Sequence, residues 1–248
     1  MIRFLEKIAA DAFVGLEEIL YDGWELRFTQ GFTGRANSVQ IREASTIELP
    51  KKVAFCEKAY ARHDLPCMFK LTDADGELIS YLEQRGYRVT KPTDVMLLAL
   101  DQTDAGCDAQ EVSAGVYFSA TPEGWFESYF AFENMQDKTK QELTKKIHAK
   151  VAVDQVYIRV MHEEKVAAVA SLAIESGYSL LHNVVVSPNL RGIGLGKKLC
   201  QAAIRKSKAC GATHIYLQVM QDNPVALSLY RKLAFEKQYT YYYVVQQA

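Results

Sequence analysis

The sequence has few cysteines, and none of them is paired at the spacing that metal and redox motifs use. Five cysteines stand at positions 56, 67, 107, 200 and 210 of the 248 residues, and no C-x-x-C motif occurs. An odd number of widely spaced thiols does not make a disulfide framework, and it fits the reducing environment of a cytoplasm. We therefore expect a cytoplasmic protein with reduced thiols and no metal site.

Long apolar runs and an excess of charge of one sign are also missing. No run of eighteen apolar residues occurs, so no membrane-spanning helix is expected. The first twenty residues contain acids throughout and lack a small-residue cleavage site, so they predict an amphipathic helix rather than a signal peptide. The formal net charge is −1, which provides no global positive field for nucleic acid or an acidic membrane. We expect neither as a partner.

The composition is that of a folded globular protein. Hydrophobic residues make up 49% and charged residues 24% of the chain, and its length is enough for one large or two small domains. A polar, glycine-containing stretch from Leu100 to Glu111 lies between two strand-like runs. The predicted domains are therefore residues 1–104 and 105–248.

Strand and helix patterns alternate in both halves, which predicts an α/β fold. Residues 155–188 predict a three-stranded antiparallel meander with turns near Glu163-Glu164 and Ser176-Gly177. A helix from about residue 194 is predicted to end at Gly211, and a later helix to begin with Asn223 as its N-cap.

A weak internal repeat relates the two halves. The segment MFKLTDADGELISYLEQRGY can be placed over IYLQVMQDNPVALSLYRKLAF, which matches Leu82 with Tyr230 and Tyr87 with Phe235. Either the halves are diverged copies of one fold, or the likeness is that of any strand–helix unit. Since the first half has no loop of alternating glycines, only the second half would keep the chemistry described next.

Three glycines alternate where a strand meets a helix, in VVVSPNLRGIGLGKKL at residues 184–199. Bare backbone at a helix N-terminus is suited to a phosphate or diphosphate, although glycines also serve simple packing in a tight turn. The Walker A pattern does not match, because it requires glycine at the position of Arg191. The Rossmann pattern does not match either, because it requires glycine at the position of Lys197. A nucleotide kinase and a dehydrogenase are thereby excluded.

This loop, together with THIYLQVMQDNPVALSLYRKLAFEK downstream, resembles the acyl-CoA-dependent N-acyltransferases of the GNAT superfamily. Arg191, Gly194 and Gly196 match the signature positions. The hairpin DGWELRFTQGFTGRANSV resembles one found in bacterial two-half acetyltransferases. The resemblance implies a GNAT fold, with a mixed twisted sheet, splayed central parallel strands and flanking helices, preceded by a smaller, diverged GNAT-like half.

The resemblance also implies acetyl-CoA as cosubstrate and places it on particular residues. Residues 180–186 and 213–220 would be the splayed strands, with the pantetheine arm paired to the first of them. The implied coenzyme-binding residues are Val184, Val185, Val186, Arg191, Gly192, Ile193, Gly194, Leu195, Gly196, Lys197 and Asn223. Asn223 can instead serve only as a helix cap.

In the implied reaction, a neutral primary amine of a small molecule or peptide attacks the thioester directly. Tyr230 matches the tyrosine of the family that protonates the leaving thiolate. The base is open between Glu175, His182 and a water chain. Cys200 is not expected to act as a nucleophile.

Four further residues are candidates for binding the acceptor. Trp125 belongs to an aromatic helix that can line a pocket or only pack in the core, and Arg27, Arg35 and Asn37 can hold a carboxylate. The acceptor itself and the choice between monomer and homodimer remain open. A binding module that holds CoA without catalysis is the alternative function.

Overall fold

The computed structural model describes residues 1–100 and 114–247. Its contacts divide the chain into two compact units. The first unit comprises Met1–Asp94, Leu143–Val151 and Gln238–Ala248, and the second comprises Val95–Glu142 and Ala152–Lys237. The predicted boundary at residue 104/105 lies outside the described residues. The units also differ from the two predicted contiguous halves, because the C-terminal segment belongs to the first unit.

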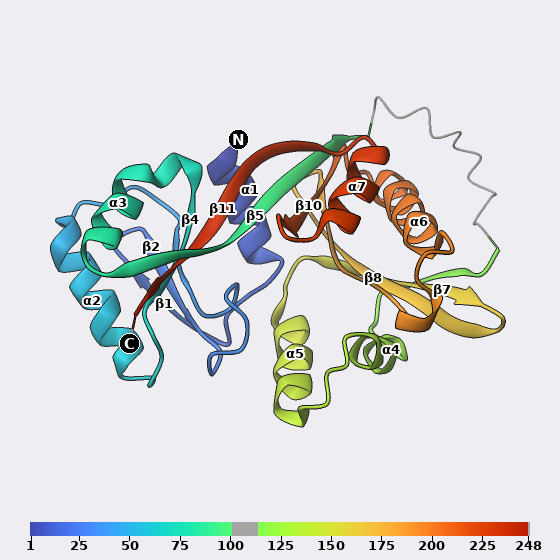
Figure 1. The fold of residues 1–248 in the computed structure, drawn as a ribbon, viewed down its shortest axis with the longest axis horizontal. Coiled ribbons are helices and arrows are strands. Elements are labelled where there is room, and N and C mark those ends of the chain that lie inside the picture. The colour runs from blue at the N-terminus through green and yellow to red at the C-terminus, as the bar shows by residue number, and fades with distance from the viewer. Residues whose placement is uncertain (101–113, 248) are drawn as a thin grey trace. The chain divides into compact units, whose positions relative to one another are not determined.

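The first unit is built on a sheet with the strand order β1-β2-β3-β4-β11. Its strands are β1 (Glu17–Tyr21), β2 (Trp24–Phe28), β3 (Val39–Ile41), β4 (Met68–Thr72) and β11 (Glu236–Gln246). Only the β3–β4 pair is parallel; the other neighbours are antiparallel. Its helices are α1 (Ile2–Asp11), α2 (Leu49–Ala61) and α3 (Gly76–Gln84), with a short 3₁₀ turn, η1 (Asp73–Asp75), before α3 (Figure 1).

The core of the first unit explains why these segments fold together. Alternate residues of β2, namely Trp24, Leu26 and Phe28, are buried against Val53 and Tyr60 of α2. This alternation gives one apolar face to the strand, while the three- and four-residue spacing gives one to the helix.

The second unit contains the predicted antiparallel meander. The strands β7 (Asp154–His162), β8 (Lys165–Glu175) and β9 (Tyr178–Val186) pair in sequence, with β6 (Val116–Ser119) beside β7 and β10 (His214–Met220) parallel to β9. The predicted turns are confirmed: Glu163-Glu164 and Ser176-Gly177 all have positive φ, which is the geometry of tight hairpin turns. A long strand, β5 (Tyr87–Ala99), leads from the first unit into the second.

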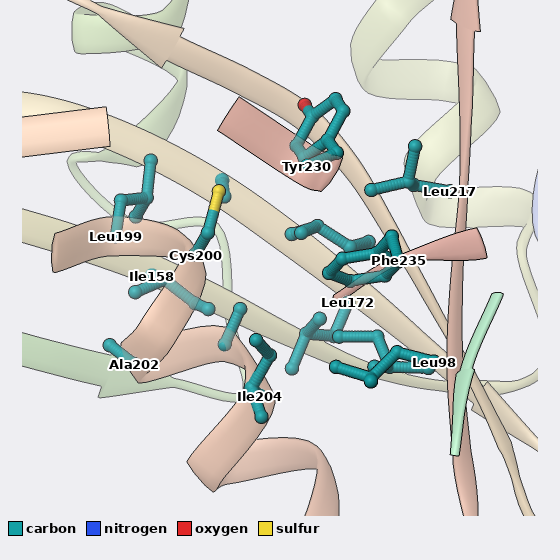
Figure 2. Packing of buried hydrophobic residues seen from close by; sticks show 14 of the residues in the cluster. Leu98, Ile158, Leu172, Leu199, Cys200, Ala202, Ile204, Leu217, Tyr230 and Phe235 are labelled. Carbon is teal, nitrogen blue, oxygen red and sulfur yellow. The ribbon is translucent and has the colours of Figure 1, made fainter. Parts of the chain in front are cut away.

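Helices cover both faces of this meander. These helices are α4 (Trp125–Phe132), α6 (Leu195–Ala209) and α7 (Pro224–Lys232), and a 3₁₀ turn, η2 (Pro188–Leu190), precedes α6. Helix α5 (Lys138–Lys150) follows α4 in the chain, and from Leu143 onward it belongs to the first unit. Leu199 and Cys200 of α6 pack with Ile158 and Leu172 in one core (Figure 2). Trp125 and its aromatic neighbours on α4 pack with Tyr157, Val169 and Val185 in another. Adjacent residues of these strands therefore point to opposite faces of the sheet, one packed against α6 and the other against α4.

The order of elements repeats along the chain, so the predicted internal repeat is confirmed. The series β1-β2-β3-α2-β4-α3-β5 recurs as β7-β8-β9-α6-β10-α7-β11. In both series the third and fourth strands are parallel. Gly86 and Ala234, which the sequence repeat aligns, both have left-handed φ, at +84° and +63°.

None of the described helices combines the length and the apolar character that are needed to cross a bilayer.

Candidate functional site

The two central strands of the second unit separate part-way along their length. β9 and β10 are paired only between Tyr178–Leu181 and His214–Leu217. β9 continues to Val186 and β10 to Met220 without further pairing to each other. Within the described residues, the backbone of β9 beyond Leu181 therefore has no partner strand on the β10 side, which is the splay that the resemblance to the GNAT superfamily implies.

A β-bulge in β9 lies beside this separation. Val185 pairs with Val169 and His182 with Ser171, so β9 has one more residue than β8 in the interval. Asn183 in this interval has φ of +54°, and asparagine tolerates that conformation better than most residues. The extra residue resets the alternation, because Leu181 and Val184 both face the core under α6.

The indole of Trp125 holds α4 against the bulged region. Its Nε1–H donates to the carbonyl oxygen of Ala170 at 2.9 Å, opposite the bulge, and the side chain is completely buried. Trp125 is thus placed in the core, and its hydrogen bond supports the shape of the strand pair.

The glycine loop between η2 and α6 presents bare backbone. Gly192 and Gly194 have φ of +85° and +91°, and a Cβ at either position would meet no atom within 4 Å. At Gly196, a Cβ would lie 3.5 Å from Leu229 and 3.7 Å from Val186, in ordinary contact. The first two glycines are therefore required by the turn, and they leave open space above the loop.

The amides of this loop are available to an anion. Gly194 is the N-cap of α6, and the carbonyl oxygen of Gly194 accepts from Lys198 N at 3.1 Å. The amides of Leu195, Gly196 and Lys197 consequently belong to the first turn, where no intrahelical acceptor exists. With the positive end of the helix dipole, this geometry fits a diphosphate.

Three basic side chains border the loop. Arg191 Nε lies 3.4 Å from the carbonyl oxygen of Val186, Lys197 is exposed, and Lys198 Nζ donates to Ala114 O at 2.8 Å. Each can add positive charge near an anion bound on the loop.

Tyr230 lies on α7 in the same core as α6. It is 7% exposed and packs edge-on against Phe235, with ring centroids 5.9 Å apart (Figure 2). Burial, and secondarily the nearby Cys200, raises the pKa of the Tyr230 phenol well above its usual value. The phenol is therefore neutral across the physiological range.

Two other candidate residues, Asn223 at the exposed start of α7 and Cys200 in the core, have simpler roles. The side-chain oxygen of Asn223 accepts from Ala226 N at 3.1 Å, so the predicted N-cap of α7 is confirmed. Burial raises the pKa of the Cys200 thiol to about 12, which keeps it protonated and unreactive.

The two candidate bases lie far apart, one in the middle of β9 and the other at the end of β8. His182 is buried at the first position after the pairing with β10 stops. Its Nδ1 is 3.3 Å from Asn183 Nδ2, which also donates to Ser171 Oγ at 2.9 Å. Glu175 pairs with Tyr178, at the start of β9 and roughly 13 Å along the strand from His182 by the rise per residue. Only His182 is therefore placed at the separation.

The other predicted acceptor residues lie in the first unit. Arg27 is 1% exposed, and its guanidinium donates to Phe13 O at 2.5 Å and to Glu25 at 3.0 Å. Asn37 is buried and accepts from Thr29 N at 2.7 Å, while Arg35 stacks on the Phe13 ring at 4.0 Å. These contacts account for the three residues within the unit.

Sequence reasoning missed the group around His182. The sequence pattern does not indicate Asn183 and Ser171, because the bulge at which they meet depends on pairing between two strands. The one available signal was an asparagine within a β-branched run, LLHNVVV.

Comparisons with known proteins agree with this geometry. A family model described as "Probable histone acetyltransferase Rv0428c C-terminal" matches residues 1–244. An uncharacterized N-acetyltransferase, YobR of Bacillus subtilis (strain 168), is 23% identical over 99% of both chains. A GCN5-related N-acetyltransferase from Kribbella flavida superposes with a TM-score of 0.68 at 16% identity, covering 100% of this chain and 94% of that one. A tandem GNAT protein from the clavulanic acid biosynthesis pathway gives 0.64 at 14% identity, over 84% and 74%. The fold is that of the GNAT superfamily.

Proposed function

The chain belongs to the probable histone acetyltransferase Rv0428c C-terminal family, and from this premise we propose that it transfers an acetyl group from acetyl-CoA to a primary amine. Its GNAT fold and its N-acetyltransferase relatives support the reaction class. The observation that carries the proposal is the bare loop at residues 192–196 beside the open end of β9 and β10. The acceptor is a small molecule or a peptide.

The loop would hold the coenzyme through its backbone. The amides of residues 192–197 would donate to the diphosphate, and Lys197 and Arg191 would add positive charge. The backbone of Val184 and Val186 lies beyond the part of β9 that pairs with β10, and it would form hydrogen bonds with the pantetheine arm. Acetyl-CoA supplies the thioester and leaves as the CoA thiol.

Tyr230 would act as the general acid. The amine nitrogen bonds to the thioester carbon, the carbon–sulfur bond breaks, and the thiolate takes the proton of the phenol. Because its pKa is raised, Tyr230 is protonated when the thiolate forms.

His182 would accept the proton that the amine loses, directly or through water. It lies on the face of β9 opposite Leu181, hence opposite the core that contains Tyr230. An acid and a base on opposite faces of a separated strand pair suit a reaction that takes place between the strands. Glu175, at the end of β8, has no part in this proposal.

A substitution in the loop tests the proposal. Gly194→Ala projects a methyl group into the space above the loop. Gly211→Ala is the control, because it adds a methyl group in open space at the other end of α6, away from the loop. Both residues have left-handed φ, at +91° and +81°, so both variants carry similar backbone strain. We expect the Kd for acetyl-CoA, measured by calorimetry, to rise about tenfold or more only in Gly194→Ala, the equivalent of roughly 1.4 kcal/mol.

Turnover distinguishes an enzyme from a binding module. Thiol release from acetyl-CoA with a panel of amines is expected for the wild type. Equal coenzyme affinity in the wild type and Gly194→Ala would refute the loop as the binding site. Tight binding without thiol release from any amine would favour the non-catalytic alternative.

A further inference from the structure

The loop of the second unit has a counterpart in the first. Residues 47–53 read IELPKKV and residues 193–199 read IGLGKKL, with the isoleucine, the leucine and both lysines in common. The structure supports this alignment, because α2 begins at Leu49 and α6 at Leu195, each between two parallel strands. Glu48 and Pro50 replace Gly194 and Gly196.

An anion already occupies this counterpart, and it is the carboxylate of Asp22. Thr46 N donates to it at 3.0 Å and Ile47 N at 2.9 Å, and the Thr46 hydroxyl donates at 2.7 Å. Lys52 Nζ lies 3.2 Å away. In the alignment, the two amides correspond to those of Gly192 and Ile193, and Lys52 corresponds to Lys198.

The environment is built for a negative charge. Lys52 is completely buried and lies over the Trp24 ring at 4.0 Å. These donors, the Ile47 amide foremost, hold the pKa of Asp22 far below its usual value. A carboxylate with four donors around it is a firmly bound anion.

The β1–β2 turn delivers Asp22 to the loop. Asp22 and Gly23 have φ of +45° and +77°, and Gly23 O accepts from the amides of Arg42 and Glu43, both at 2.9 Å. A Cβ on Gly23 would lie 2.7 Å from Ala44 O, so only glycine allows this approach. Turn and loop are therefore docked together.

The corresponding turn of the second unit leaves its loop open. Asp22-Gly23 aligns with Glu163-Glu164, since Tyr21 pairs with Trp24 as His162 pairs with Lys165. The Glu163 side chain is 87% exposed and lies near His162. The space above Gly192 and Gly194 contains no described atom within 4 Å of an added Cβ.

We propose that Asp22 is the built-in ligand of a second anion site, holding in the first unit the place that the coenzyme diphosphate takes in the second. The chain then binds one acetyl-CoA, a count that rests on the proposed function. Removing the Asp22 carboxylate opens the first site to a small oxyanion.

Thermal unfolding of Asp22→Ala in chloride and in inorganic phosphate tests the site. We expect the Tm in chloride to fall by roughly 3–8 °C, since charged hydrogen bonds are lost. Phosphate should then raise the Tm of Asp22→Ala by several degrees more than that of the wild type. If Asp22→Ala does not fold in chloride, its refolding yield in phosphate replaces the Tm as the readout.

Two matched variants complete the test. Glu163→Ala, at the equivalent turn, should behave like the wild type in both salts. Asp22→Asn keeps the shape of the side chain, so it should lose stability without any extra gain in phosphate. An equal phosphate response of Asp22→Ala and the wild type would overturn the proposal.

Calorimetric titration with acetyl-CoA checks the count. One coenzyme per wild-type chain is expected, and two per chain would overturn the assignment of Asp22 as a permanent ligand. Absence of coenzyme binding would refute the proposed function but would leave the phosphate rescue of Asp22→Ala as a separate result.

Discussion

At the scale of single residues, burial decides what Tyr230 can do. The phenol lies in an apolar core with Phe235 and Cys200, so its ionised form is disfavoured. The phenol is therefore neutral at physiological pH, which is the protonation state that the proposed general acid requires.

Replacing Tyr230 by phenylalanine should lower kcat about 10²-fold, the size typical of general acid catalysis, with little change in the acetyl-CoA KM. Steady-state kinetics measures this. Tyr157→Phe is the control, because that phenol is buried on the opposite face and bonds Gln155 at 2.9 Å. Equal loss of kcat in both variants would remove Tyr230 from the mechanism.

The pH profile supplies an independent check on Tyr230. A raised pKa means that the phenol stays protonated at higher pH than an ordinary tyrosine. The kcat of the wild type should therefore show no loss from phenol ionisation up to about pH 10, the ordinary tyrosine pKa. A high-pH limb below that value which disappears in Tyr230→Phe would contradict the burial argument.

His182 is expected to matter for the rate if it accepts the proton of the amine. His182→Gln keeps a polar side chain but removes the ring nitrogen that would take the proton, so kcat/KM should fall about 10²-fold. His162→Gln, at a partly exposed histidine of the β7–β8 hairpin, should keep the wild-type kcat/KM.

At the scale of elements, the start of helix α7 allows two roles of Asn223, helix capping and coenzyme binding, to be tested separately. Asn223 caps the helix through its side-chain oxygen, and serine is an equally good cap. Asn223→Ala should lower the free energy of unfolding by about 1 kcal/mol, whereas Asn223→Ser should be nearly neutral.

The acetyl-CoA affinity of the two variants, Asn223→Ala and Asn223→Ser, decides whether Asn223 also binds the coenzyme. If Asn223 only caps α7, the Kd for acetyl-CoA in Asn223→Ser should equal that of the wild type. A tenfold weaker Kd in the serine variant, measured by calorimetry, would show that the amide itself bonds the coenzyme.

At the scale of the whole molecule, the last strand, β11, has a double membership. In chain order it ends the second series of repeated elements, but most of its residues lie in the first compact unit. Residues 238–248 are part of that unit, and β11 pairs antiparallel with β4 from Tyr241–Thr72 to Val245–Met68. Val244 is completely buried in its core. The first unit is therefore completed only when the C-terminus of the chain is present.

Deletion of residues 238–248 should expose β4. Hydrogen exchange at Phe69–Leu71 should accelerate, because β4 loses one of its two neighbouring strands, β11, and keeps only β3. The amides of β8, whose partners are β7 and β9, should remain more protected than those of β4. Unchanged protection of β4 would contradict this division into units.

Much of the second unit follows from the sequence alone. The hairpin turns at Glu163 and Ser176, the cap at Asn223 and the positive φ of Gly211 are determined by a few neighbouring residues. The glycine loop is of the same kind, since the conformational freedom of Gly192 and Gly194 is a local property.

Only the tertiary structure decided the remaining features. The bulge at Asn183, the placement of His182 at the strand separation, the burial of Trp125 and Arg27, and the docking of Asp22 on its loop all join residues far apart in the sequence. The pairing of the last strand, β11, with β4 is of the same kind. Local preferences are encoded within one turn or strand, whereas register and burial depend on which distant segments pair, and no short pattern records that choice.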